Sequence, residues 1–188
     1  MFVALALPGR VEERLGEAQS LLKRELSDAD IRWQRLEQSH LTLRFLGEVE
    51  ARALPACRLA VSEAARRSRP FTLSTAGFGA FPTPARPSVL WLGVGGDREE
   101  LDHLQSLVTA GLEHVADASR TETFRPHLTL GRVKRMGQAA RSAFADLLNA
   151  PPPAPVSWRV ESVALLSSEL RASGARYEEL LSARLAAS

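Results

Sequence analysis

The chain has a single cysteine, Cys57, among its 188 residues, which excludes a disulfide within the chain. A lone thiol is typical of proteins in reducing compartments, so we expect a cytoplasmic protein. Cys57 lies at helical spacing from three apolar residues, Leu54, Val61 and Ala64. This spacing predicts a small buried hydrophobic residue at position 57 and not a reactive thiol.

Long apolar segments are also missing. No run approaches the roughly 18 apolar residues that are needed to cross a bilayer. The first ten residues, MFVALALPGR, have no basic leader, and a Pro-Gly pair follows the short apolar run. We therefore expect this segment to be a first strand and not a signal peptide.

Lysine is scarce, because 22 of the 24 basic residues are arginine. Arginine suits phosphate, since its planar guanidinium can donate two hydrogen bonds side by side. A GC-rich genome would produce the same bias, and the formal net charge is only +2. Composition by itself therefore does not indicate a nucleic-acid partner.

Strand-like and helix-like segments alternate along the chain. The expected strands are 2–7, 40–47, 70–78, 88–94, 127–133 and a last long strand at 156–166, and the expected helices are 11–26, 51–67, 98–116 and 138–149. Three prolines predict a loop at 82–88, while 150–155 should be a stiff connector and 167–180 a loop or hairpin tip. Asp97, with Glu100 three residues later, predicts a capping box at the start of the helix 98–116.

This order of elements, approximately βα-ββα given twice, indicates an α+β fold. We expect two lobes, each a small, mainly antiparallel sheet with helices on its outer face. An approximate twofold axis should relate the lobes, with a cleft between them. Together they would form one two-lobed domain over residues 1–188.

The sequence His-Leu-Thr-Leu occurs twice, at 40–43 and at 127–130, and uses two of the four histidines in the chain. Side chains of a strand alternate between its two faces. His40 and Thr42 should therefore point one way while their leucines point into a core, and His127 and Thr129 should do the same. If the two strands face each other across a cleft, two imidazoles and two hydroxyls surround one small space.

These groups suit acid–base chemistry on a phosphodiester. An imidazole has an ordinary pKa near 6.5, so one ring can accept a proton while the other donates one. Threonine hydroxyls can donate to the non-bridging phosphate oxygens. Arg132 has the opposite parity to His127, and a twist or bulge would bring its guanidinium to the phosphate. Such alternation is also typical of an ordinary half-exposed strand, but its repetition favours a site.

The other two histidines, His103 and His114, are eleven residues apart on the expected helix 98–116. They lie opposite the apolar stripe of that helix, so both should be exposed to solvent. Asp102 and Glu113 are close in sequence, but their spacing does not favour a metal site.

At these residues the chain resembles the two-histidine phosphoesterase superfamily, which is defined by two H-x-T/S-x motifs on the two lobes of a bilobal α+β fold. Within it, the chain is most similar to the bacterial and archaeal RNA 2′,3′-cyclic phosphodiesterases, historically called LigT-type 2′-5′ RNA ligases. The similar segments are FVALALP, HLTLRFLGEV, FGAFPTPARPSVLWLGV, FRPHLTLGRV and SSELRASGARYEEL.

The resemblance implies a catalytic pair, with His40 as the proton donor and His127 as the proton acceptor. It implies that Thr42, Thr129 and Arg132 bind the substrate phosphate, and that no metal or other cofactor takes part. The partners would be RNA ends or nucleotides with a 2′,3′-cyclic phosphate. We also expect no membrane partner and a monomeric protein.

The activity that the resemblance implies is metal-independent hydrolysis of a 2′,3′-cyclic phosphate to a 2′-phosphate. Reversible joining of tRNA half-molecules through a 2′-5′ linkage uses the same two histidines and stays open. A non-catalytic RNA-end or nucleotide binder also stays open, although binding alone seldom needs two titrating groups. Four aromatic residues are candidates for stacking on a base, and the core is the expected place of each: Trp33, Phe45, Phe124 and Tyr177.

Overall fold

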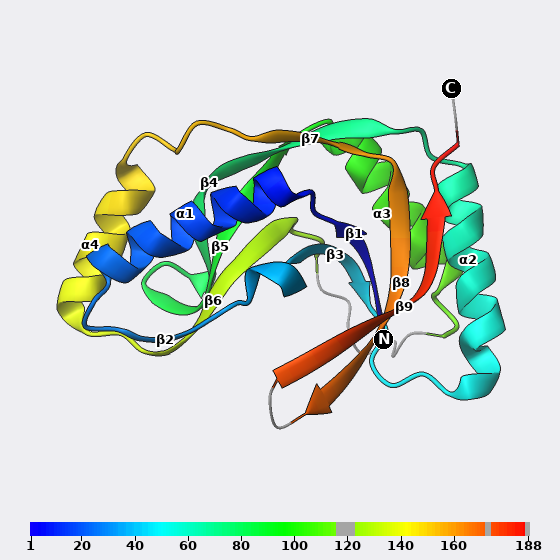
Figure 1. Ribbon diagram of the computed structural model, residues 1–188, viewed down its shortest axis with the longest axis horizontal. Helices are drawn as coiled ribbons and strands as arrows, with labels where there is room; N and C mark the ends of the chain where they lie inside the picture. The colour runs from blue at the N-terminus through cyan, green and yellow to red at the C-terminus, as the bar shows by residue number, and fades with distance from the viewer. Residues whose placement is uncertain (116–122, 172–173, 187–188) are drawn as a thin grey trace.

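The computed structural model describes residues 1–115, 123–171 and 174–186, and the strands of these residues form two sheets (Figure 1). The four-stranded sheet has the order β3 (His40–Phe45), β1 (Phe2–Ala6), β8 (Ser162–Arg171) and β9 (Gly174–Arg184). The five-stranded sheet has the order β2 (Asp30–Trp33), β6 (His127–Arg135), β5 (Arg86–Gly96), β4 (Phe71–Thr83) and β7 (Ser157–Val160). All neighbouring strands are antiparallel, as expected for this α+β fold.

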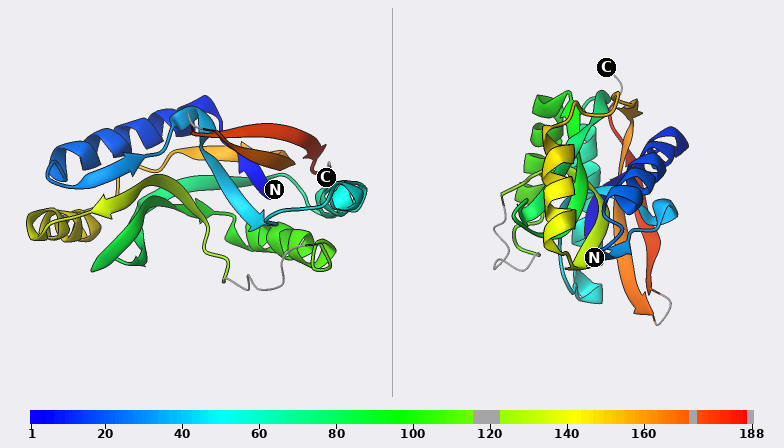
Figure 2. Two further views of the ribbon diagram at one scale, coloured as in Figure 1. Left: turned by 90° about the horizontal axis from the view of Figure 1, so that it is seen from below. Right: turned by 90° about the vertical axis from the view of Figure 1, so that its left-hand side faces the viewer.

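Helices cover both sheets: α1 (Gly9–Glu25), α2 (Leu54–Arg66), α3 (Arg98–Gly111) and α4 (Gln138–Asn149), with two short 3-10 turns, η1 (Leu36–Gln38) and η2 (Ala51–Ala53). The pair α1 and α4 packs on the five-stranded sheet, and the pair α2 and α3 packs on the four-stranded sheet. Figure 2 shows these two pairs at opposite ends of the molecule. In the described part of the chain, no helix is both long and apolar enough to span a membrane.

The two lobes correspond strand by strand, which agrees with the expected twofold relation. The order β3-β1-β8-β9 matches the order β6-β5-β4-β7, with β2 added beyond β6. The connecting helices also correspond, because α1 follows β1 and packs on β6, whereas α3 follows β5 and packs on β3. Each lobe therefore contributes one helix that covers the sheet of the other lobe.

A single apolar cluster runs through both lobes. The leucines of both tetrapeptides belong to it, and each is at most 3% exposed: Leu41, Leu43, Leu128 and Leu130. Cys57 is fully buried in the same cluster, as predicted. Each such leucine contributes roughly 1.5–3 kcal/mol by its burial, so the core holds both motif strands, β3 and β6, in place.

The prediction of a loop at 82–88 is wrong. β4 continues to Thr83 and β5 begins at Arg86, so the turn between them is only 84–85. Pro82 lies opposite Pro87. Neither proline has an N–H to donate, and proline is tolerated near the end of a hairpin, where few ladder hydrogen bonds remain to be made.

The single long strand expected at 156–166 is also wrong. The chain forms β7 in one sheet and β8 in the other, and the exposed Glu161 separates them. Apolar residues continue on both sides of Glu161, so the sequence does not reveal the change of sheet. The predictions do not include β2, which has only four residues and lies at the edge of its sheet.

For the segment 167–180 the sequence predicted a loop or a hairpin tip, and the structure shows a hairpin. Residues 167–171 belong to β8 and residues 174–180 to β9, and the two strands are paired. The tip at 172–173 lies outside the described residues.

Asp97 does not form the predicted capping box, because its side chain makes no hydrogen bond to the helix. Its Oδ2 accepts a hydrogen bond from the backbone N–H of Thr72 at 2.8 Å, and its own N–H donates to the carbonyl of Thr72 at 2.8 Å. The carboxylate therefore ties the start of α3 to β4. The helix also ends at Gly111, earlier than predicted.

Candidate active site

A β-bulge in β6 determines which residues face the cleft. Thr129 and Gly131 pair with adjacent residues of β5, so Leu130 between them is an extra residue without a partner. One inserted residue reverses the alternation of faces in the strand beyond it. Arg132 therefore lies on the same face as His127 and Thr129, as the sequence required for a phosphate site.

The same bulge occurs in β3. Thr42 and Arg44 pair with adjacent residues of β1, so Leu43 is the extra residue. Phe45 consequently shares a face with His40 and Thr42. Its ring is 51% exposed, so the prediction that Phe45 lies in the core is wrong. Phe45 is the counterpart of Arg132 in the twofold relation of the lobes.

A glutamine supports each bulge: Gln19, which is buried, and Gln105, which is half-buried. Gln19 Nε2, on α1, donates to the carbonyl of Leu130 at 3.0 Å and to that of Gln34 at 2.7 Å. Gln105 Nε2, on α3, donates to the carbonyl of Leu43 at 3.4 Å. Each glutamine thus donates to the carbonyl of the extra residue. Gln19 lies on α1, which follows β1, and Gln105 lies on α3, which follows β5, so each comes from a helix of the other lobe. Sequence reasoning did not identify either glutamine.

The two imidazoles are oriented by equivalent contacts. His40 Nδ1 lies 3.0 Å from the carbonyl oxygen of Gln38, and His127 Nδ1 lies 2.7 Å from that of Arg125. A carbonyl oxygen only accepts, so we assign the proton of each neutral ring to Nδ1. Nε2 is then the nitrogen that gains or loses a proton.

Burial lowers the pKa of His40, its hydrogen bond to Gln38 partly offsets this effect, and the charge of His127 lowers the pKa further. Burial also lowers the pKa of His127, its bond to Arg125 partly offsets this effect, and the charges of Arg125 and Arg132 lower it further. The contact of β3 with β6 and this charge effect bring the two rings into one electrostatic environment. Two cations surround His127, whereas the charge that acts on His40 is that of His127 itself.

Aromatic side chains form one wall beside each histidine. The ring of Phe2 stacks on His40 with a centroid distance of 4.7 Å and an interplanar angle of 28°, and Tyr177 meets His40 edge-on at 5.3 Å. Phe81 meets His127 edge-on at 4.7 Å. Tyr177 is half-buried beside the histidine, so it lies at the site and not in the core.

Trp91 completes the wall beside His127, with a centroid distance of 6.2 Å from its ring. Gly79, on the neighbouring strand, makes this position possible, because a methyl group at Gly79 would overlap the indole. Glycine is therefore needed here for the close approach of a side chain.

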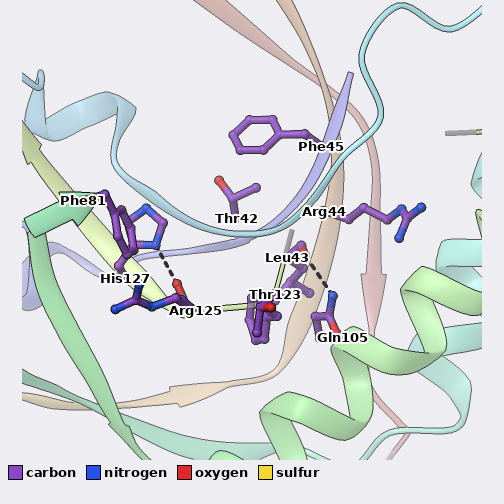
Figure 3. A pocket seen from close by; sticks show the side chains of 10 residues that line it. Thr42, Leu43, Arg44, Phe45, Phe81, Gln105, Thr123, Arg125 and His127 are labelled. Atoms are coloured by element: carbon purple, nitrogen blue, oxygen red, sulfur yellow. Dashed lines mark hydrogen bonds between the residues drawn. The ribbon is translucent and has the colours of Figure 1, made fainter. Parts of the chain in front are cut away.

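A cavity of about 530 Å³ opens beside the histidine pair (Figure 3). Its lining residues are Thr42, Leu43, Arg44, Phe45, Phe81, Gln105, Thr123, Phe124, Arg125 and His127. Figure 3 shows Thr42 and Phe45 reaching it from β3, with His127 and Phe81 on its other side. Of the five predicted site residues, Thr42 and His127 line this cavity, while the other three lie beyond its lining.

Arg125 is a site residue that sequence reasoning missed. Its guanidinium lies 4.7 Å from the centroid of the Phe81 ring, and its carbonyl holds the His127 ring. The sequence did contain an indication of this role. Arg125 is two residues before His127, and side chains two residues apart in an extended chain point to the same face. Neither Thr42 nor Thr129 forms a hydrogen bond through its hydroxyl to any described residue, so both hydroxyls are available to a ligand.

The two remaining histidines behave as predicted, since His103 and His114 are both exposed. Among the residues that the structure describes, no three side chains of histidine, cysteine, aspartate or glutamate gather in a way that would hold a metal ion.

Two histidines in identical tetrapeptides, on contacting strands of two antiparallel sheets, form the arrangement that the resemblance to the two-histidine phosphoesterases implies. The sequence model of the 2′-5′ RNA ligase superfamily matches residues 7–172, so the chain belongs to this family.

Curated relatives carry the name RNA 2′,3′-cyclic phosphodiesterase. The protein from Methanothermobacter thermautotrophicus is 34% identical over 181 residues, which cover 95% of each chain. The protein from Thermus thermophilus is 32% identical over 188 residues, which cover 96% of this chain and 87% of the relative. The chain is thus similar to these enzymes over nearly its whole length.

Solved structures have the same fold. TT0787 of Thermus thermophilus superimposes with a TM-score of 0.78 at 29% identity, and the match covers 98% of this chain and 96% of that one. LigT from E. coli, complexed with 3′-AMP, gives a TM-score of 0.78 at 25% identity with the same coverage. These likenesses confirm the predicted two-lobed α+β fold.

Replacing Gln19 by methionine should disturb the site through the bulge in β6. The substitution keeps the volume but removes both side-chain hydrogen bonds. The carbonyl of Leu130 keeps the backbone N–H of Gln34 at 2.9 Å, while that of Gln34 loses its donor, so the free energy of unfolding should fall by about 1–3 kcal/mol. If the bulge relaxes, Arg132 moves away from His127, and the pKa of His127 should rise toward its ordinary value. NMR titration of the imidazole rings and urea unfolding measure both effects.

Ser20→Ala on the same helix is the control, because the Ser20 hydroxyl is exposed and donates only to the carbonyl of Gly16. This variant should leave both measurements unchanged. An unaltered titration of His127 in Gln19→Met would show that the glutamine does not position the site.

Proposed function

We propose that the chain is a hydrolase that opens 2′,3′-cyclic phosphates at RNA ends or on nucleotides and leaves a 2′-phosphate. The observation that carries the proposal is the pair of imidazoles that share one site, each with Nδ1 bound to a carbonyl and Nε2 left for proton transfer. Curated relatives with the name RNA 2′,3′-cyclic phosphodiesterase support the same substrate class.

The reaction balances with these groups alone. Water attacks phosphorus, and His127 Nε2 takes the proton of that water as the new P–O bond forms. The bond between phosphorus and the 3′ oxygen breaks, and His40 Nε2 gives its proton to that oxygen. Attack and departure lie roughly in line, so the acid and the base belong on opposite sides of phosphorus, one from each lobe. The 5′-hydroxyl of a second RNA in place of water would lose its proton to His127 and form a 2′-5′ linkage, while the bond to the 3′ oxygen breaks and His40 protonates that oxygen.

The different surroundings of the two histidines support these roles. The positive charges of Arg125 and Arg132 favour neutral His127, which can accept a proton. His40 has no such arginine among the causes of its pKa, and the face of Phe2 lies against its ring. An aromatic face attracts a cation, which favours the charged form that a donor needs.

Thr42, Thr129 and Arg132 would bind the non-bridging phosphate oxygens. The two hydroxyls lie on the faces of their histidines and have no internal partner in the described residues. Arg132 reaches the same face because of the bulge. The exposed Phe45 lines the adjoining cavity and would provide a flat apolar surface for the base of the terminal nucleotide.

Cyclic-phosphate hydrolysis by EDTA-treated protein tests the proposed function. We expect RNA that ends in a 2′,3′-cyclic phosphate to give a 2′-phosphate product. His40→Ala and His127→Ala should each lower the rate by about 10²–10⁴ with the fold preserved. His103→Ala and His114→Ala, the matched controls, should keep the wild-type rate. Turnover that needs added metal, or an unfolded His40 or His127 variant, would contradict the proposal.

The rate should already be falling when the pH reaches about 6.5, the ordinary pKa of histidine, and should continue to fall above it. A donor must be charged, and a lowered pKa means that the charged form is lost at a lower pH than usual. We therefore expect a bell-shaped profile of kcat/KM with both midpoints below 6.5, because kcat/KM reports the free enzyme. Steady-state rates from pH 4.5 to 8.5 measure it, and a plateau up to pH 8 would refute the assigned protonation states.

A sulfur atom in place of the 3′ oxygen should separate the two roles. A thiolate leaves without much help from an acid, so this substrate should largely restore the rate of His40→Ala. His127→Ala should stay slow, because water still has to lose its proton. Single-turnover rates of both variants with both substrates give the answer. Restoration of His127→Ala instead would reverse the two roles.

A further inference from the structure

A basic pocket lies at the end of β6 that is farthest from His127. It has a volume of about 320 Å³, and its lining residues are Arg86, Pro87, Val133, Lys134, Arg135, Met136 and Arg141. They come from the start of β5, the end of β6 and its exit, and the first turns of α4. Four of these residues carry a positive charge and none carries a negative charge.

Acidic side chains offset only part of this charge. Lys134 Nζ lies 3.9 Å from Asp30 Oδ1, at the limit of an ion pair. Among the described residues, Arg86, Arg135 and Arg141 have no ion pair. Asp28 approaches the backbone beside the pocket at Gly137. The pocket therefore keeps an excess of positive charge that an anion would balance.

Arg141 is held in place for such an anion. Its Nε donates to the carbonyl of Met136 at 3.2 Å, which fixes the guanidinium plane and leaves the terminal nitrogens available. The first turn of α4 contains no acidic residue. Since the N-terminus of a helix carries a partial positive charge, an anion bound there would be stabilised further.

Two further arginines connect this pocket with the histidine pair. Arg132 of β6 lies directly opposite Arg32 of β2, and both are exposed. Like charges that face each other on paired strands destabilise the pair. Neither arginine has an ion pair among the described residues, so a phosphate that lies between them would remove this repulsion.

The spacing of these charges suits a nucleic-acid strand. His127 and Arg135 are the first and last residues of the nine-residue strand β6. At about 3.3 Å per residue, they lie about 26 Å apart. A stacked strand, at about 3.4 Å per nucleotide, would cover this length with about eight nucleotides, and an extended strand with fewer.

We propose that the basic pocket binds backbone phosphates of single-stranded RNA, upstream of a cyclic end that lies at the histidine pair. This inference rests on the proposed function and adds the substrate class to it: oligonucleotides long enough to reach from the site to the pocket are preferred to mononucleotides. Arg32 and Arg132 contact the strand between the two ends, and the pocket holds the part beyond them.

Two substrates with the same terminal nucleoside test the proposal. They are 2′,3′-cyclic AMP and an unstructured 12-nucleotide RNA that ends in adenosine 2′,3′-cyclic phosphate. In low salt, wild type should have a roughly 10–100-fold higher kcat/KM for the 12-mer, through KM, and the advantage should shrink as salt rises. Arg86→Gln/Arg141→Gln should lose most of this advantage and keep the wild-type rate on cyclic AMP. Its plot of log(1/KM) against log salt should be less steep by about 1.4, at about 0.7 for each lost contact.

Arg58→Gln/Arg69→Gln is the matched control, since it removes the same charge from exposed arginines on and next to α2, at the opposite end of the molecule (Figure 1). It should behave as wild type on both substrates. Equal kcat/KM of wild type on the two substrates, or equal losses of the two double variants on the 12-mer, would overturn the proposed RNA site. An equal loss by Arg86→Gln/Arg141→Gln on both substrates would also overturn it, because the pocket would then act on the fold. If wild type turned over neither substrate, this would instead refute the proposed function.

Discussion

The extra leucine in each motif strand is the constraint on which the arrangement of the site depends. In a regular strand, Arg132 and Phe45 would point with the leucines toward the core, away from the histidines. An unpaired residue in a strand leaves backbone groups that must find other partners. Gln19 and Gln105 supply donors to these carbonyls. Because each glutamine lies on the helix that covers the other lobe, the exchange of helices and the geometry of the site depend on each other.

The two halves share a tetrapeptide but differ at the positions that set its charge. Two residues before the histidine, one half has Gln38 and the other has Arg125; beyond the bulge, one has Phe45 and the other has Arg132. The backbone contacts of the imidazoles are equivalent, so both halves orient the ring in the same way. The charge differs between the halves, and the cations gather around one histidine. Symmetry thus supplies two equivalent imidazoles, and its local failure gives them different electrostatic surroundings, on which the two roles proposed above are based.

The pattern of apolar residues predicted most of the fold, because alternation and helical spacing report directly on burial. It predicted the leucines of both tetrapeptides in the core, the exposed controls His103 and His114, and the two-lobed arrangement. It missed β2 and the change of sheet at Glu161, since which strands pair is decided by contacts far apart in the chain. The prolines at 82–88 were misleading because a proline destabilises a strand only where its missing N–H would have donated a hydrogen bond to the neighbouring strand. Gln19 was missed because nothing in the local sequence shows where a bulge places a carbonyl.

Each lobe is covered by a helix from the other lobe, and this arrangement also limits how the two imidazoles can move relative to each other. The lobes cannot separate without removing α1 from β6 and α3 from β3, and both contacts belong to the apolar cluster that runs through the molecule. The distance between the two imidazoles is therefore set by packed backbone and not by flexible side chains. Groups that are already in place when the substrate binds need no reorganisation as charge develops on phosphorus, which is how fixed dipoles and charges accelerate a reaction. Each small sheet has few residues for a core of its own. Packing against the other lobe therefore provides both stability and a fixed geometry of the site.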